Sequence, residues 1–250
     1  MSVSLALQVW AVRATLLAVP FLVYFAWRDL GRLWGGASRT VRWSLSALVV
    51  VGFALRATLS LWSVNHENAI GLAILEESAA LARHPTYGLG GYVLYSAAQR
   101  FAGGAHPAAV FILNAVLGAL TPALVFAVAM GLYRSATAGL VAAALVALNP
   151  AHVRLSASEC LFIPYVFWAL LAFAAVLAAA HPGARDGSRW RDLPVWLLAS
   201  AATSLAVQTR PLGILLVLCL VPALVVGGGR PFGAAFRRVP LWVAVALCGA

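Results

Sequence analysis

Charged side chains are scarce in this chain: they make up 10% of its 250 residues, and only seven of them are acidic, whereas 63% of all residues are hydrophobic. A soluble globular domain carries about 25% charged residues, so this shortage excludes an ordinary soluble domain. The apolar excess excludes intrinsic disorder. Long, continuous apolar runs argue against the alternating segments of a β-barrel. The composition therefore predicts an all-α, polytopic membrane protein.

Lysine is absent, and all seventeen basic residues are arginine. A genome-composition bias is the main explanation, with phosphate recognition as a further reason at individual sites. The formal net charge of +10 would suggest nucleic acid in a soluble protein. Here the arginine enrichment of cytoplasmic loops explains that charge, so no nucleic-acid partner is expected. Cys160, Cys219 and Cys248 are scattered, which indicates neither a disulfide framework nor a zinc site.

The apolar runs predict about seven to eight transmembrane helices, judged against about 20 residues for one span. They lie at residues 4–27, 43–64, 107–132, 136–151, 160–180, 194–209, 211–227 and 239–250. The fourth and sixth runs are short enough to be tilted or broken. The last is half a span, which leaves open whether this is the front part of a longer protein.

The gaps between these runs alternate in charge. Asp29, Asp186 and Asp192 share their gaps with many arginines, whereas Glu67, Glu76, Glu77 and Glu159 lie in gaps with few. The positive-inside rule places gaps 28–42, 133–135, 181–193 and 228–238 in the cytoplasm. Gaps 65–106, 152–159 and the surroundings of Arg210 then face outward. This register predicts a multi-pass protein of the cytoplasmic (inner) membrane. Arg13, inside the first run, leaves open that the first helix lies along the interface.

The outward gap at 65–106 is long enough to be functional rather than a simple connection. Its apolar residues and its two adjacent acids, Glu76 and Glu77, predict an extracytoplasmic amphipathic helix on the membrane surface. Both acids are expected to face water. Tyr92 and Tyr95 follow, and we expect them at the depth of the lipid headgroups.

Glu67 stands at the exit of the second run between His66 and Asn68. Partial desolvation raises the pKa of such a carboxyl toward the range useful for a general base, and a neighbouring His can relay a proton. The alternative is a solvated acid at a helix start, where the helix dipole favours it.

Two further polar groups interrupt apolar runs on the same predicted face. His152, Arg154 and Glu159 lie within eight residues of one another, and polar groups there usually face a bundle interior or an aqueous cavity. The alternative is a helix break at Pro150 with Ser158 capping the next helix. Arg210 precedes a helix-breaking proline and can bind a phosphate, or it serves as a lipid-headgroup anchor.

These segments, in this order, resemble GT-C membrane glycosyltransferases, particularly family 39 members related to protein mannosyltransferases and to the lipid A aminoarabinose transferase. The similar segments are Val-Asn-His-Glu-Asn at 64–68, Asn-Ala-Val-Leu-Gly at 114–118, Leu-Asn-Pro-Ala-His at 148–152, Ser-Glu at 158–159 and Ser-Leu-Ala-Val-Gln-Thr-Arg-Pro at 204–211. The resemblance divides the chain into an extra N-terminal span with a basic loop (1–42), a GT-C-like module (43–227), and a basic loop with an incomplete last span (228–250). It departs from the family in having His66, not Asp, before Glu67.

The resemblance implies transfer of a sugar from a polyprenyl-phosphate donor to a lipid, glycan or protein hydroxyl on the extracytoplasmic face. Glu67 would be the general base, and Arg210 would bind the donor phosphate. His66, Asn68, His152, Arg154 and Glu159 would contribute to substrate binding. No nucleotide-sugar site is expected, no metal ligands are assigned, and a divalent metal cofactor is left open.

Two readings from other classes compete with a transferase. A transporter or flippase of a lipid-linked precursor would line its path with the same polar groups, although the internal repeats common in transporters are not evident. A truncated, non-catalytic homologue is the other alternative.

Overall fold

The computed structural model describes residues 3–62, 88–104, 106–180, 193–215 and 219. Within these ranges the regular elements are all helical, which confirms the all-α class. They are α1 (Val3–Leu33), α2 (Arg39–Trp62), α5 (Leu89–Phe101), α6 (Pro107–Tyr133), α7 (Ala136–Leu148), α8 (Pro150–Ser156), α9 (Phe162–Ala180), α10 (Leu193–Thr209) and the short 3-10 helix η2 (Pro211–Ile214).

Four of the described helices, α1, α2, α6 and α9, are long and apolar enough to cross a membrane. The pair α7 and α8 makes a fifth if it is one broken span, because the two helices are bent by 59° at their junction. This break was expected for the fourth apolar run. The α10 helix has 17 residues and is shorter than a full span. The predicted seven to eight spans are therefore not confirmed: the described residues hold four to five, and most of 211–250 lies outside them.

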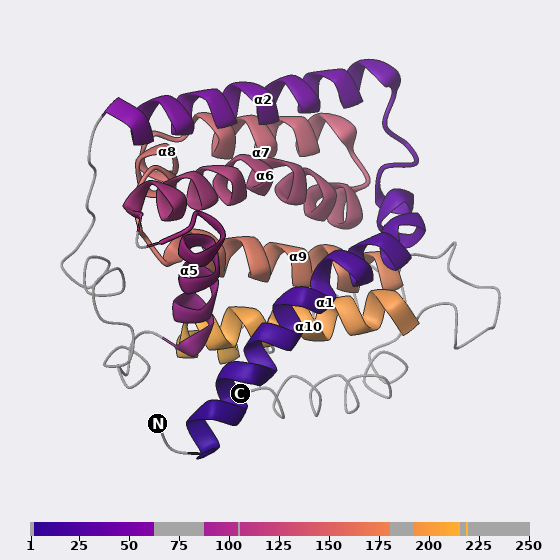
Figure 1. Cartoon of the computed structure of the whole chain (residues 1–250). Coiled ribbons are helices and arrows are strands. Elements are labelled where there is room, and N and C mark those ends of the chain that lie inside the picture. Colours follow the sequence, from indigo (N-terminus) through magenta and orange to yellow (C-terminus); the bar gives the residue numbers. More distant parts are fainter. Residues whose placement is uncertain (1–2, 63–87, 105, 181–192, 216–218, 220–250) are drawn as a thin grey trace.

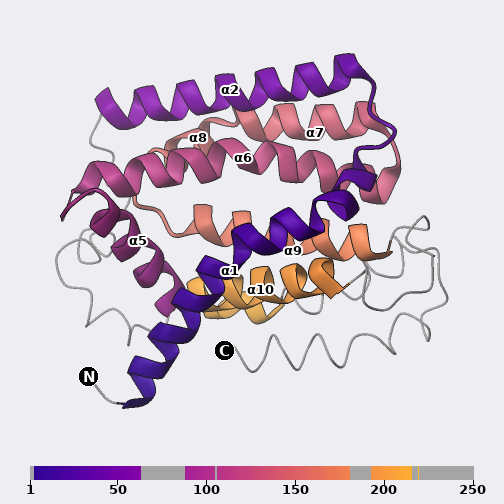
Figure 2. The ribbon, with the colours of Figure 1, turned by 45° about the vertical axis from the view of Figure 1, so that its right-hand side comes forward.

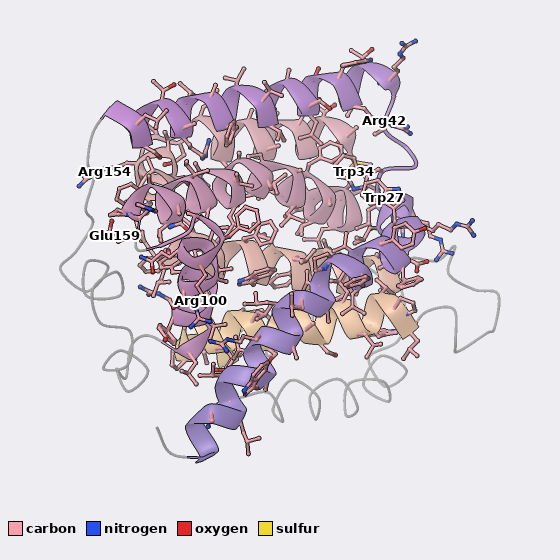
Figure 3. All side chains as sticks on the ribbon, viewed as in Figure 1. Trp27, Trp34, Arg42, Arg100, Arg154 and Glu159 are labelled. Carbon is pink, nitrogen blue, oxygen red and sulfur yellow. The ribbon has the colours of Figure 1, made fainter. Side chains whose placement is uncertain are left out.

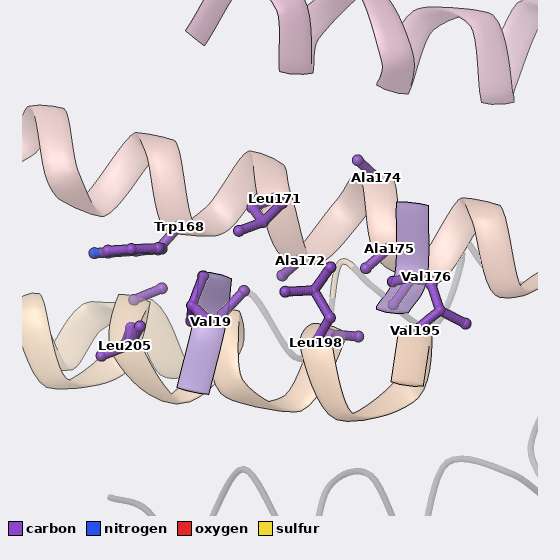
Figure 4. Close-up of a cluster of buried hydrophobic side chains, with 14 of the residues drawn as sticks. Val19, Trp168, Leu171, Ala172, Ala174, Ala175, Val176, Val195, Leu198 and Leu205 are labelled. Atoms are coloured by element: carbon purple, nitrogen blue, oxygen red, sulfur yellow. The ribbon is translucent and has the colours of Figure 1, made fainter. Parts of the chain in front are cut away.

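The helices lie roughly side by side, with α6 between the pair α2 and α7 and the pair α9 and α10, while α1 crosses α9 and α10 obliquely (Figure 1). The main hydrophobic core fills the space between α9, α10 and α1 (Figure 4). Many of its buried residues are alanines, such as Ala172, Ala175 and Ala202. Small side chains let membrane helices approach closely, which suits packing without a strong hydrophobic drive.

The outer faces of α1 and α2 carry large exposed apolar side chains, including Trp10, Phe21 and Trp27 on α1 and Trp43 and Leu61 on α2. In water these faces would be unfavourable, whereas a lipid environment matches them. Arg13 lies within α1 with its guanidinium 5.5 Å from the ring centre of Trp10, a cation–π contact that lowers the cost of a charge among apolar neighbours.

The two ends of the helix bundle differ in chemistry. Trp27, Trp34 and Arg42 mark one end, and Arg154 and Glu159 mark the other, which we call the polar end (Figure 3). At the first end Asp29 forms an ion pair with Arg32 at 2.6 Å, as expected for an acid in an arginine-rich gap. The arrangement therefore separates the segments that the charge pattern assigned to opposite faces.

Candidate functional site

The polar end contains the junction at which α7 breaks and α8 begins. Asn149 caps α8, since its side chain accepts a hydrogen bond from the His152 backbone N–H at 3.0 Å, and Pro150 occupies the first helical position. Proline has no N–H, so the carbonyl of Val146, four residues earlier, loses its usual helical donor. The sharp turn after Asn149 deprives the carbonyl of Ala147 in the same way.

Arg56 on α2 supplies the missing donors. One of its terminal nitrogens donates to the Ala147 carbonyl at 3.2 Å and to the carbonyl of Gly52 at 2.7 Å; the other donates to the Val146 carbonyl at 3.5 Å. The side chain is fully buried. A cation also suits the negative end of the α7 dipole. Arg56 thus joins α2 to the broken span, and the guanidinium is largely satisfied inside an apolar bundle.

The same guanidinium reaches His152, a predicted substrate-binding residue. The second terminal nitrogen of Arg56 lies 2.8 Å from His152 Nδ1. Ser156, one turn later on α8, donates its hydroxyl to the His152 carbonyl at 2.6 Å. A side chain on Gly118 of α6 would collide with Ser156 and would lie 3.1 Å from Arg56 Nε. Glycine at that position is what allows α6, α8 and Arg56 to meet.

Arg56 is not among the site residues predicted from the sequence, although a signal for it is present. An arginine in the middle of the apolar run at 43–64 is a charged residue at membrane depth, and such residues are rare and usually functional. The predicted site residues all come from the gaps between runs, whereas Arg56 lies inside a run.

A second polar network holds the turn between α8 and α9. Asn114 on α6 donates through its side-chain nitrogen to the carbonyl of Ser158 at 2.7 Å, to the hydroxyl of Tyr95 at 2.8 Å and to the carbonyl of Cys160 at 3.2 Å. The Tyr95 hydroxyl in turn donates to the carbonyl of Glu159 at 3.0 Å. These contacts fix the backbone on which Glu159, 1% exposed, is carried.

Tyr95 and Ser158 have roles at this turn that the sequence did not predict. Tyr95 is fully buried in α5, where its hydroxyl belongs to the Asn114 network, and its depth in the membrane stays a prediction. Burial raises the pKa of Tyr95 well above its usual value, which keeps the hydroxyl a donor. Ser158 does not cap α9: its hydroxyl donates to the carbonyl of Leu155 at 2.8 Å and accepts from the N–H of Cys160 at 3.3 Å, so it stabilises the turn.

Arg210 follows the last residue of α10, and Pro211 begins η2, as the helix-breaking role of this proline predicted. The guanidinium carbon lies 3.4 Å from the ring centre of Phe162, the first residue of α9. This stacking is a favourable cation–π arrangement that orients the guanidinium.

The start of α5 docks beside the C-terminal end of α10, as the turned view shows (Figure 2). The N–H of Gly88 donates to the carbonyl of Thr209 at 3.2 Å. A side-chain carbon on Gly90 would lie 2.9 Å from the Gln208 carbonyl carbon and the Thr209 nitrogen. Glycine is therefore needed for this close backbone approach.

The polar end brings together several of the predicted site residues. His152 is half-buried, Arg154 is exposed on α8, and Glu159 is buried three residues before Phe162, on which Arg210 stacks. Glu67, His66 and Asn68 lie outside the described residues, as does the predicted amphipathic helix, so their assignments stay predictions. No cluster of three or more potential metal ligands occurs among the residues that the structure describes.

Comparison with known proteins decides the family. The family model for dolichyl-phosphate-mannose-protein mannosyltransferases matches residues 90–245, more than half of the chain. The chain belongs to this family. No curated protein and no solved structure matches. The protein is therefore a multi-pass membrane protein of a glycosyltransferase family whose general donors are polyprenyl-phosphate-linked sugars. The matched range contains His152, Glu159 and Arg210 and begins after Glu67.

Proposed function

We propose that this protein transfers a sugar from a polyprenyl-phosphate donor to an acceptor hydroxyl on the extracytoplasmic face of the membrane. Family membership supports the reaction class. The observation that carries the proposal is the gathering of His152, Glu159 and Arg210 at one end of the bundle, since an active site needs its groups on one face. The gap 28–42, which holds four arginines, lies at the opposite end with Arg42, and this supports the assignment of the polar end to the outside (Figure 3).

In the proposed reaction, Glu67 is the general base. It takes the proton of the acceptor hydroxyl, whose oxygen then attacks the anomeric carbon of the sugar. The bond between that carbon and the phosphate oxygen breaks, and polyprenyl phosphate leaves with its electron pair. Glu67 follows the last residue of α2, Trp62, by five positions, a stretch that spans at most about 18 Å. This reach is compatible with a base serving the polar end.

Arg210 is proposed to bind the donor phosphate. As the leaving group departs, negative charge grows on the phosphate oxygens, and a fixed cation there lowers the barrier. The contact with Phe162 supports this role, because it holds the guanidinium before the donor arrives. His152, Arg154 and Glu159 are proposed to shape the pocket for the donor headgroup.

Transfer of radiolabelled sugar from polyprenyl-phosphate donors in membranes tests the assignment of the base. Glu67→Gln keeps the shape of the side chain and removes the base, so transfer should fall by about 100-fold or more. Glu76→Gln is the matched control, because this nearby acid is predicted to be solvated, and its transfer should stay near the wild-type rate. Equal transfer by Glu67→Gln and the wild type would remove Glu67 from the mechanism.

Sidedness requires a separate measurement. Single cysteines at positions 67 and 189, in a chain whose native cysteines are replaced, should react with a membrane-impermeant thiol reagent from opposite sides. Reaction of both positions from the same side would reject the proposed orientation.

A further inference from the structure

We propose that Arg56 is a positioning residue that holds His152 as the neutral imidazole with its proton on Nε2, so that His152 donates a hydrogen bond to an oxygen of the lipid-linked sugar. The ligand in this statement rests on the proposed function, whereas the tautomer rests on geometry alone. The family model matches residues 90–245, a range that does not include Arg56.

The chemistry of the guanidinium decides the tautomer. Its N–H groups only donate, and it keeps its charge at every accessible pH. A terminal nitrogen 2.8 Å from His152 Nδ1 therefore requires a lone pair on Nδ1. The hydroxyl of Ser156 lies 3.4 Å from the same nitrogen, but it donates to the His152 carbonyl at 2.6 Å. With Nδ1 as the acceptor, the single proton of the neutral ring belongs to Nε2.

The guanidinium of Arg56 is held in place by several hydrogen bonds and cannot move away from His152. Its two terminal nitrogens also donate to backbone carbonyls of α2 and α7, which cannot move without unwinding a helix. A doubly protonated imidazole would set an N–H against a guanidinium N–H and would place a second cation in contact with the fully buried Arg56. The arrangement thus excludes His152 as a proton carrier. The function left to it is to donate a hydrogen bond from Nε2.

The state of His152 Nε2 indicates that this atom binds a ligand. The atom is buried and has no hydrogen-bond partner among the residues that the structure describes. A buried N–H without a partner costs about 1–3 kcal/mol, so such groups are rarely left unmatched in a functioning protein. A phosphate or sugar oxygen of the lipid-linked donor would satisfy it, and both are acceptors.

Few ionisable groups lie on the helices packed around α8, and the turn that follows α8 carries Glu159, which is buried. The α7 helix has none. On α6 the only one is Tyr133, at the far end of that helix, and on α9 it is Tyr165. Arg154, on α8 itself, is exposed. Arg56 is the charged group whose contact with the imidazole is direct.

The first arm of the test measures the tautomer by nitrogen-15 NMR of the full chain in detergent micelles, with labelled histidine. The chain has five histidines, and the signal that disappears in His152→Gln identifies His152; exposed His106 is an internal reference for a solvated ring. We expect a lone pair on Nδ1 and a proton on Nε2 at pH 7. In Arg56→Met the other tautomer should become detectable. A proton on Nδ1, or on both nitrogens, in the wild-type protein would overturn the inference even if Arg56→Met fails to fold.

The second arm adds a short-chain polyprenyl phosphate mannose, with binding measured in parallel by calorimetry. The Nε2–H signal of His152 should shift at saturation, and free mannose and inorganic phosphate distinguish a sugar contact from a phosphate contact. His152→Leu should raise KM by about 10-fold or more, whereas His152→Gln, which keeps an N–H donor, should recover most of that loss. If the donor binds and the signal does not move, the inference fails; if no donor binds at all, the proposed function fails and the tautomer result stands.

Discussion

Replacing Arg56 with methionine is expected to destabilise the protein, because methionine fills similar space and brings no donor. Three acceptors lose their partner in this variant: the carbonyl of Val146, the carbonyl of Ala147, and Nδ1 of His152. The substitution leaves all three acceptors in place, because two are backbone carbonyls and the third belongs to His152. They remain buried at the bend between α7 and α8.

The size of the effect follows from the value of each bond. Hydrogen bonds between side chains inside membrane proteins contribute about 0.6 kcal/mol on average, and typical bonds in soluble proteins contribute about 1 kcal/mol. Three bonds therefore give a loss of about 2–3 kcal/mol. For a chain of this size, about 1 kcal/mol shifts Tm by about 2–4 °C. We expect Tm to fall by about 4–12 °C.

Thermal unfolding in detergent, followed by circular dichroism at a fixed scan rate, measures this shift. Arg39→Met is the matched control, because Arg39 lies at the start of the same helix and is exposed; its Tm should stay within about 2 °C of the wild type. An Arg56→Met protein as stable as the Arg39→Met protein would show that the carbonyls at the bend do not need the guanidinium. The inference that the hydrogen bonds of Arg56 join α2 to the broken span formed by α7 and α8 would then be wrong.

Substitutions at Gly118, Asn114 and Gly90 test the close contacts at the polar end by the same Tm measurement. Gly118→Ala should lower Tm because the added carbon meets Ser156, whereas Gly31→Ala has open space and should raise Tm slightly; equal shifts would contradict the packing of α6 on α8. Asn114→Asp should cost more than Asn114→Ala, because a carboxylate would face three oxygen atoms, and the reverse order would contradict the donor network. Gly90→Ala should lower Tm through a collision with rigid α10 backbone, and an unchanged value would mean that α5 docks elsewhere.

The sequence predicted the elements whose cause is local. The stop at Pro211 and the break at Pro150 follow from proline chemistry, and both are present. The separation of Asp29 from Glu159 at opposite ends of the bundle also followed from charge spacing along the chain. These features depend on residues that are close together in the sequence, so the sequence alone is enough to predict them.

The features that the sequence did not predict depend on contacts between distant segments. For Tyr95 the sequence predicted only a place at the depth of the lipid headgroups, without any partner for its hydroxyl. Its burial requires Asn114 and the turn at Glu159, which come from other helices. Arg56 acquires its partners only after α7 has broken and turned back past α2. The local sequence around Tyr95 or Arg56 does not predict these contacts with other helices.

Stability and function meet at the break between α7 and α8. Pro150 removes a donor, which leaves carbonyls that need a cation, and Arg56 meets that need. The same break lets α8 turn away, which brings His152 Nδ1 to 2.8 Å from a terminal nitrogen of that cation. One proline therefore accounts for a buried arginine and, through it, for the protonation of a histidine at the candidate site. Arg210 reaches the polar end independently, through α10 and the ring of Phe162. Substitutions at Arg56 should consequently impair folding and sugar transfer together, whereas Arg210→Lys, which gives up the stacked guanidinium and leaves the α7–α8 bend untouched, should reduce transfer with little change in Tm.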